Sequence, residues 1–396
     1  MTAILFFSEI ILPELKVQMD MKNSSRGNLW RANKHRIPGW LATVFLTLST
    51  GLWTFWGVGE MFYEGWWGSW TNRLPYLVPM AICWIFAFLA LTWPRLGGWI
   101  LILFGGAFTT WRLVRQAQLS QFSLEWALSW FPLSGLFIII GLLFLLEGRF
   151  RRQGSPAGEL LPPRWRQRNL RYLIVFAPSL LIVIGVTLFF IPLLSSRYDD
   201  GQRGARLIEG NGVRLVWAPA GPGWSSGVGP SQEAGRLLPG ANLSWNAIAF
   251  FGIPPVGYGD KLGYEEQDAR ETDMRRTGLC CYLSEDGLSL MPDPQNIWRM
   301  PTTDEIVRSL VRGGDNAGCT WDGQSNKADC KRQPNKDTPL WAPDTSPIYY
   351  YSGEAYDEGS AWYVPYTGGG SYGGVIGPQS KDGGNARHGY RCVREP

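Results

Sequence analysis

The sequence predicts a multi-pass α-helical membrane domain followed by a soluble α+β domain. Five apolar runs of near-membrane length lie in residues 1–194, and none lies in residues 195–396. The chain is 45% hydrophobic and only 18% charged, which excludes a disordered or fibrous protein. We therefore predict a cytoplasmic N-terminal tail over residues 1–38, a five-helix transmembrane domain over 39–194 and an outer domain over 195–396.

Loop charges decide how many of the apolar runs cross the membrane. The runs cover residues 40–58, 76–93, 97–111, 128–146 and 172–194, and the third is shorter than the roughly 20 residues that a crossing helix needs. Five spans with the N-terminus inside place 14 Lys and Arg in cytoplasmic segments and three outside. If the third run does not cross, the four remaining spans place nine Lys and Arg in cytoplasmic segments and eight outside. The positive-inside rule therefore favours five spans in the cytoplasmic (inner) membrane, with the C-terminal domain outside, in the periplasm or extracellular space.

Charge also divides the chain into two parts with different partners. Residues 1–194 carry a net charge of +9 and residues 195–396 carry −5, which gives the total of +4. The basic excess thus belongs to the part that contacts the lipid bilayer, and no nucleic-acid partner is expected because the soluble part is acidic. No Asp, Glu, Lys or Arg lies inside a predicted run, which disfavours an ion-coupled transporter. Gly105, Gly106, Ser134 and Gly135 are small enough to allow close helix packing.

The C-terminal part is predicted to be rich in loops, with short strands and helices. It contains 31 glycines, about twice the ordinary share of ~7%. Strand-like runs occur at residues 212–218, 348–352, 361–366 and 390–394. One helix is predicted to start after Thr302, which has capping-box spacing to Glu305, and to end near Gly313. A second helix is predicted within residues 265–283.

Aromatic and acidic side chains between two of these strands form the candidate binding site. Tyr350, Asp357, Trp362 and Tyr366 are the candidate ligand-binding residues, because aromatic faces beside acidic oxygens suit a glycan or a peptide. Alternation along a strand predicts that about half of the six aromatic residues face the core instead; they are Tyr349, Tyr350, Tyr351, Trp362, Tyr363 and Tyr366. Glu354, Asp357 and Glu358 are weak candidates to hold calcium, but we favour a solvated hairpin turn there and expect no cofactor.

Catalytic motifs are not found in the sequence. The chain has two histidines, His35 and His388, so it holds no multi-histidine metal site. A Ser-His-Asp arrangement could use only His388, and no nucleophile-elbow motif accompanies it. We predict His388 at the surface or at a strand edge, and we predict no catalytic residue.

Five cysteines lie in the outer domain, where an oxidising compartment favours disulfides. Cys319 and Cys330 enclose the polar loop CTWDGQSNKADC, which has no apolar face to order it. Closing a loop of about 12 residues contributes about 3 kcal/mol in the chain-entropy model, so we predict that these two cysteines pair. The odd number of cysteines leaves one thiol free.

The order of several segments carries a resemblance. GVRLVWAPAG, LCCYLS, IWRMPTTDEIVRSLVRGG, YYYSGEAYDEGSAWYVPY and GGGSYGG followed by HGYRCVRE occur in that order. The C-terminal half resembles C-type-lectin-like domains, above all those at the C-terminus of Legionella collagen-like adhesins, and the formylglycine-generating (sulfatase-modifying factor) family. The membrane half is not assigned to a family.

The resemblance implies a lectin-like fold and a further disulfide, but not an activity, because this fold carries many functions. It implies that Cys280 pairs with Cys392 and that Cys281 is free. Formylglycine-generating enzymes use two cysteines near this tail to bind copper, and the matching stretch GGVIGPQSKDGGNARH has none. We therefore expect a non-catalytic ligand-binding or scaffolding domain. The alternatives are a formylglycine-generating-type oxidoreductase or protein-modifying enzyme, and a docking subunit of an envelope complex.

Overall fold

The computed structural model divides the chain into two compact units. It describes residues 37–66, 70–118, 124–153, 165–219, 244–254, 268–344, 347–368, 376–383 and 387–396. Met1–Gly59 and Tyr76–Thr187 form a helical unit, and Glu60–Pro75 and Leu188–Pro396 form a sheet unit. The predicted tail up to residue 36, the loop at 154–164 and the glycine run at 369–375 lie outside the described residues.

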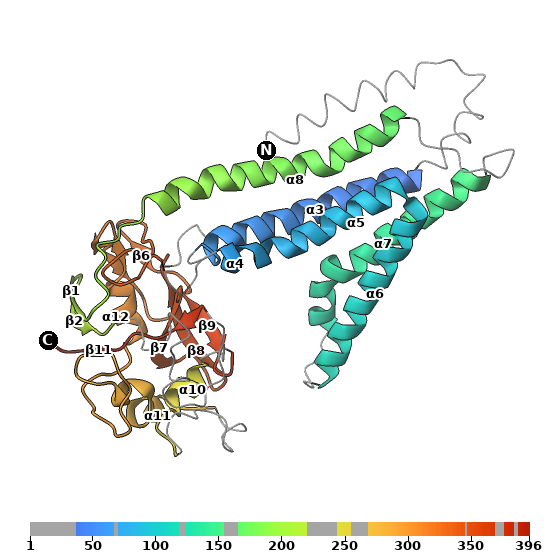
Figure 1. Ribbon diagram of the computed structural model, residues 1–396. Helices are drawn as coiled ribbons and strands as arrows, with labels where there is room; N and C mark the ends of the chain where they lie inside the picture. The colour runs from blue at the N-terminus through green and yellow to red at the C-terminus, as the bar shows by residue number, and fades with distance from the viewer. Residues whose placement is uncertain are drawn as a thin grey trace. The chain divides into compact units, whose positions relative to one another are not determined.

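Long helices cover most of the described part of the N-terminal half (Figure 1). They are α3 (Ile37–Tyr63), α5 (Val78–Thr92), α6 (Pro94–Gln118), α7 (Leu124–Gln153) and α8 (Trp165–Ser195), with the short α4 (Trp70–Arg73) and η1 (Leu74–Leu77) before α5. Among the described residues, four stretches are long and apolar enough to cross a membrane: Ile37–Tyr63, Leu74–Thr92, Pro94–Val114 and Asn169–Ser195. The third predicted run, residues 97–111, therefore belongs to a helical stretch of 21 residues, which is long enough to cross a membrane although the run alone is not. The fourth predicted run lies in α7, a helix of 30 residues.

Small residues bring α6 and α7 into close contact, and the two helices lie side by side (Figure 1). A Cβ atom added to Gly98 would lie 2.8 Å from the carbonyl oxygen of Gly141, and one added to Gly105 would lie 2.8 Å from that of Ser134. Larger side chains would force these backbones apart. The prediction is thus confirmed for Gly105 and Ser134, whereas nothing lies within 4 Å of a Cβ added to Gly106.

An ion pair is buried in the helical unit at the ends of two predicted spans. Arg171 in α8 donates hydrogen bonds of 2.8 and 3.0 Å to the two carboxylate oxygens of Glu147 in α7. Its guanidinium also lies 5.0 Å from the ring centroid of Trp40. Glu147 and Arg171 each lie one residue outside a predicted run, 128–146 and 172–194, so the runs themselves are free of charge, although the apolar helical stretch Asn169–Ser195 includes Arg171.

The sheet unit is closed by strands from its two ends. β1 (Arg206–Gly210) and β2 (Val213–Trp217) form an antiparallel pair, and β11 (Val393–Arg394) joins the free edge of β2. A second sheet has the order β10-β7-β8-β9 (Figure 1). Its strands are β7 (Tyr349–Ala355), β8 (Ser360–Pro365), β9 (Gly377–Ser380) and β10 (His388–Gly389). The β7–β8 pair is the hairpin that the sequence predicts around Asp357.

Both faces of the β7–β8 hairpin are covered, which corrects the prediction of half-buried aromatic residues. Five of the six aromatic side chains are buried, namely Tyr349, Tyr350, Tyr351, Trp362 and Tyr366. Tyr351 belongs to one apolar cluster with Ala361, and Tyr350 belongs to another with Val364. A strand between two cores buries successive side chains, so alternation does not separate core from surface here.

The helices of the sheet unit are shorter than predicted. α12 covers only Thr303–Arg308, although its start is as predicted: Thr302 and Glu305 form a capping box. The chain then turns into β3 (Val311–Arg312), which pairs with β4 (Asp315–Asn316), because Gly313 and Gly314 take the positive φ angles of a tight turn. The predicted second helix is divided into α11 (Glu271–Arg276) and the 3-10 helix η3 (Leu279–Tyr282). A third short helix is α10 (Trp245–Ala249).

Both predicted disulfides are present in the sheet unit. Cys280 of η3 is bonded to Cys392, and Cys319 of β5 (Cys319–Thr320) is bonded to Cys330 of β6 (Asp329–Cys330). Cys281 is free and buried, as expected. Its thiol donates to the carbonyl oxygen of Arg275 at 3.2 Å, and burial raises its pKa.

The segment Glu60–Pro75, which follows the first predicted span, is part of the sheet unit. The carboxylate of Glu64 accepts a hydrogen bond of 2.8 Å from the hydroxyl of Tyr349 and lies 3.0 Å from Nε of Arg387. The Tyr63 ring is buried, with its centroid 5.4 Å from that of Tyr366. A charge-assisted hydrogen bond, an ion pair and a ring contact thus hold this segment on the C-terminal domain.

Candidate ligand-binding cleft

An open cleft on the sheet unit gathers acidic and aromatic side chains from four elements. Its volume is about 480 Å³, within the ordinary range of ligand sites. It is lined by Glu271 of α11, Asp304 and Arg308 of α12, Trp321, Asp322 and Gly323 of the Cys319–Cys330 loop, and Glu354, Ala355 and Trp362 of the β7–β8 hairpin.

The β7–β8 hairpin supplies an aromatic wall. Trp362 makes T-shaped contacts with two rings, with its centroid 5.1 Å from that of Trp321 and 4.7 Å from that of Tyr356. Trp362 exposes 6% of its surface, whereas Tyr356 exposes 50%. Trp362 is therefore a fixed floor of the cleft, and Tyr356 is the accessible ring beside it.

The capping box of α12 places two charged residues at the cleft. The hydroxyl of Thr302 accepts from the N–H of Glu305, which fixes the first turn of the helix. Asp304 and Arg308 then lie one turn apart on the same face, and Nε of Arg308 donates to Oδ2 of Asp304 at 2.5 Å. The other oxygen of Asp304, Oδ1, is buried and has no hydrogen-bond partner within the described part of the chain.

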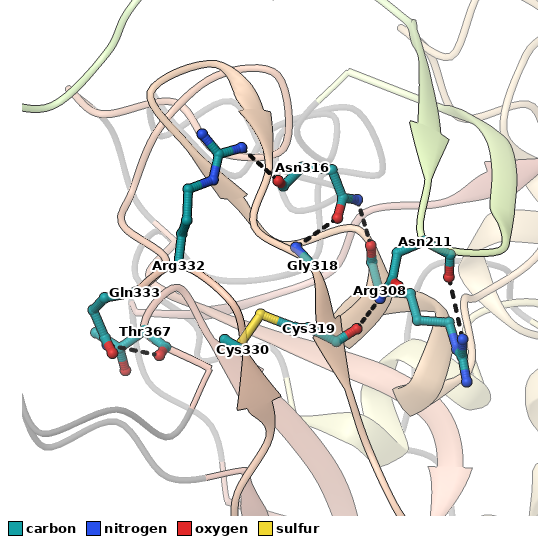
Figure 2. Close-up of a disulfide and its surroundings, with 9 residues drawn as sticks. All are labelled: Asn211, Arg308, Asn316, Gly318, Cys319, Cys330, Arg332, Gln333 and Thr367. Carbon is teal, nitrogen blue, oxygen red and sulfur yellow. Dashed lines mark hydrogen bonds between the residues drawn. A yellow bond between two sulfur atoms is a disulfide. The ribbon is translucent and has the colours of Figure 1, made fainter.

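The Cys319–Cys330 disulfide closes the loop that carries Trp321 and Asp322 (Figure 2). Around it, Asn211 donates to the carbonyl oxygen of Cys319, and Nη1 of Arg308 donates to that of Asn211 at 3.1 Å. Within the loop, Nε1 of Trp321 donates to the carbonyl oxygen of Ser325 at 2.7 Å. The disulfide and these bonds connect the loop to α12, so two walls of the cleft are held together.

Backbone N–H groups hold the remaining carboxylates in place. Glu354 accepts from the N–H of Thr303 at 2.8 Å, and Glu271 accepts from the N–H of Ala355 at 3.0 Å. Asp322 accepts from the N–H groups of Ser325 and Gln324, which lower its pKa. These three carboxylates are therefore fixed before any ligand arrives.

The predicted ligand-binding residues have different surroundings in the structure. Trp362 lines the cleft, and Asp357 lies in the nearby hairpin turn, where its Oδ1 accepts from the N–H of Gly359 at 2.9 Å. Tyr350 is buried and stacks on Trp341 with 4.0 Å between the ring centroids. Tyr366 is also buried, with the guanidinium of Arg197 5.2 Å from its centroid. A surface ligand cannot reach these two rings, so we correct their role to core packing.

The weak calcium candidates are separated by their own hydrogen bonds. The carboxylate of Glu354 points to α12 through Thr303, while Asp357 caps its turn. Glu358 accepts from Nζ of Lys381 through its backbone carbonyl, at 2.7 Å. No group of three or more His, Cys, Asp or Glu residues that could hold a metal ion occurs among the described residues.

His388 is a strand-edge residue, as predicted, but it is buried rather than at the surface. It lies in β10, the edge strand of its sheet. Its ring stacks against Tyr349 and Tyr351, at centroid distances of 4.9 and 5.2 Å. Burial, helped by the charge of Arg387, lowers the pKa of His388 to about 4. The side chain is therefore neutral near pH 7.

Sequence reasoning found one wall of the cleft and missed the others. Glu271, Asp304, Arg308, Trp321 and Asp322 were not predicted as site residues. Two signals were present: the i, i+4 pair of Asp304 and Arg308 beside a capping box, and a tryptophan inside a loop closed by cysteines.

The chain was also compared with protein-family models, curated proteins and solved structures, and none of them matches it.

Proposed function

We propose that this protein displays a non-catalytic, C-type-lectin-like binding domain outside the cytoplasmic membrane, and that the domain holds its ligand in the acidic, aromatic cleft. The observation that carries the proposal is the cleft itself, where fixed carboxylates and aromatic rings from four elements converge. The Cys280–Cys392 bond supports the lectin-like resemblance, because the resemblance implies that pairing.

The docked segment supports five spans with the C-terminal domain outside. Glu64, which follows α3, contacts Tyr349 and Arg387 within one compact unit, so the segment after α3 and the domain after α8 are expected on the same side of any membrane that the chain crosses. An even number of crossings must then separate them. Spans in α5, α6, α7 and α8 give four crossings, whereas the four-span alternative leaves three. Together with the positive-inside rule, this parity favours N-terminus inside and C-terminal domain outside.

The state of the cysteines supports binding over formylglycine-type oxidation. Cys392 and Cys280 are joined to each other, and the pKa of the buried Cys281 thiol is raised. A copper-binding thiol pair needs thiolates that are free and accessible. We expect no aldehyde when the purified protein is incubated with copper, oxygen and a cysteine-containing sulfatase peptide. Aldehyde formation that depends on Cys392 would favour the enzyme instead.

A photo-crosslinking experiment in intact cells tests the binding role. The photoreactive amino acid p-benzoylphenylalanine is placed at Tyr356, beside the cleft, and at the exposed Leu288 as a control. We expect a defined cross-linked species from position 356 and not from position 288. Equal cross-linking from the two positions would contradict a ligand site in the cleft.

A pair of reporter fusions tests the topology. A reporter that is active only outside the membrane should be active after Pro396 and silent after Arg152. The reverse pattern would contradict both the parity argument and the charge argument.

A further inference from the structure

We infer that the cleft selects a positively charged ligand, an amine or guanidinium group such as a lysine or arginine side chain, rather than a neutral glycan. This inference rests on the proposed binding function and adds the chemistry of the ligand. It follows from the charge of the walls, the fixed position of their acceptors and the burial of the central tryptophan.

The walls of the cleft carry more negative than positive charge. Glu271, Asp304, Asp322 and Glu354 line the cleft together with one cation, Arg308, and Glu271 also forms an ion pair of 3.2 Å with Arg275. Arg308 already donates to Asp304 at 2.5 Å and to the carbonyl oxygen of Asn211 at 3.1 Å. Its charge is thus used by α12 itself, and an excess of carboxylates remains. A cleft of one sign of charge attracts ligands of the opposite sign.

The carboxylates are arranged to accept hydrogen bonds from a donor. One oxygen of Glu354 is held by Thr303, and one oxygen of Asp322 is held by two N–H groups, so neither side chain must be ordered when a ligand binds. Oδ1 of Asp304 is buried without a hydrogen-bond partner in the described residues. The Asp304 side chain is 43% exposed in total, so its carboxylate contributes charge to the cleft without offering Oδ1 to a ligand.

The buried ring of Trp362 suits a cation better than a sugar. Stacking on a sugar requires a broad exposed ring face, but Trp362 exposes only 6% of its surface. The rings of Trp321 and Tyr356 stand nearly perpendicular to that of Trp362, with interplanar angles of 79° and 88°. A single ammonium or guanidinium group needs less ring surface, and it gains from both the ring and the adjacent carboxylates.

Affinity measurements on the full-length protein in detergent micelles test the ligand class. The probes are pentalysine amide, spermidine, pentaglutamine amide and the neutral glycan chitotriose. The binding of each probe is measured by titration calorimetry. We expect pentalysine amide to bind, pentaglutamine amide and chitotriose not to bind, and the affinity to fall when NaCl is raised to ~0.5 M. Spermidine binding as well would show that a free polyamine satisfies the same cationic chemistry.

Charge-neutral variants locate the binding in the cleft. The Asp322→Asn, Glu354→Gln double variant keeps the acceptors for the backbone N–H groups but removes two charges, and we expect it to weaken pentalysine binding about tenfold. Asp286→Asn is the matched control, because Asp286 is also an exposed residue that accepts from a backbone N–H two residues later, outside the cleft. The control should bind like the unchanged protein.

The outcomes separate the ligand class from the binding function. Chitotriose binding that Trp321→Leu abolishes, without pentalysine binding, would overturn the cationic ligand and leave the binding function in place. A failure of pentalysine to bind, or equal effects of the double variant and the Asp286→Asn control, would also overturn this inference. The binding function itself fails only if position 356 gives no specific cross-link in cells.

Discussion

Arg171 in the helical unit and Arg391 in the sheet unit are both buried, but their guanidinium groups have different kinds of hydrogen-bond acceptor. Arg171 is bonded to the carboxylate of Glu147 on a neighbouring helix. Arg391 donates to three backbone carbonyl oxygens, those of Ala218, Pro339 and Leu340, at 2.5 to 2.7 Å. Burial lowers the pKa of Arg391.

The difference follows from what each kind of backbone offers. Inside a helix, every carbonyl already accepts from an N–H four residues later, so a buried arginine needs a side-chain acceptor. The sheet unit is rich in irregular segments whose carbonyls are outside strand ladders, and Arg391 satisfies three of them at once. Arg171 therefore connects two helices, whereas Arg391 connects the end of the chain to the segments around Ala218 and Pro339.

The largest effect is expected for Arg391. Arg391→Met should lower the free energy of unfolding by about 5 kcal/mol, because it leaves three buried carbonyl oxygens without donors. Arg391→Lys should rescue little, because an ammonium group lacks the fork of donors. Tryptophan fluorescence in denaturant measures the effect, with Arg214→Met as the control on an exposed arginine. If Arg391→Lys were as stable as the unchanged protein, a single ammonium group would be enough to satisfy the three carbonyl oxygens. The contrast between Arg391 and Arg171 would then not depend on the several donors of the guanidinium group.

Removing the partner of Arg171 should cost slightly less. Glu147→Gln leaves a buried arginine without its counter-charge and should lower the free energy of unfolding by about 4 kcal/mol. The Glu147→Leu, Arg171→Leu double variant should recover most of this loss, because it removes both charges from the helical unit. Thermal unfolding in micelles checks both variants. If the double variant is as unstable as the single one, the pair does more than neutralise Arg171.

His388 shows a third way to bury a basic group, which is to lose its charge. Its pKa of about 4 in the folded protein lies below the ~6.5 of an unfolded chain, so the unfolded state binds more protons between these values. The stability should therefore be complete above about pH 6.5, fall as the pH decreases through this window, and level off near pH 4 with a total loss of about 3 kcal/mol.

The control for this pH dependence is His388→Phe, which keeps a ring between Tyr349 and Tyr351 but cannot bind a proton. Denaturant unfolding from pH 7 to pH 4 should lose most of its pH dependence in this variant. An unchanged slope would assign the acid sensitivity to other groups.

The smallest effect concerns the way helices begin in the two units. α12 begins with the hydroxyl of Thr302 bonded to the N–H of Glu305, whereas α5 begins after Leu77 without a side-chain cap and with a proline in its first turn. Thr302→Ala should therefore cost about 1 kcal/mol of folding free energy. Thr302→Ser should cost little, because serine caps as well as threonine does. Equal losses in the two variants would mean that the methyl group, and not the cap, is what matters.

The sequence predicts most accurately where one physical effect dominates. Apolar length located the helices α3, α5, α6 and α8, and the polar loop between Cys319 and Cys330 indicated their bond. The prediction failed where one strand packs against apolar clusters on both of its faces. β7 contributes Tyr351 to one cluster and Tyr350 to the other, so Tyr350 is buried where a ligand-binding ring was expected. The helix after Thr302 was predicted too long because the turn at Gly313 uses the same apolar residues in a strand.

The cleft could be predicted only in part because its residues are far apart in the chain. Glu271 and Trp362 are separated by about 90 positions, and only the folded backbone brings them to one site. Glu64 is a still more distant case, since a residue between two candidate spans contacts Tyr349. No local pattern marks such a contact, so neither the docked segment nor the full cleft follows from periodicity or spacing.

The pairing of β11 with β2 gives the last few residues of the chain a special place in biosynthesis. Arg391, Cys392 and Val393 complete the contacts of segments made more than 100 residues earlier. The sheet unit cannot reach its final form until this segment has been synthesised and has joined β2 and Cys280. A chain that stops even ten residues early would lack this closure, and we expect cellular proteases to remove it as an unfolded product.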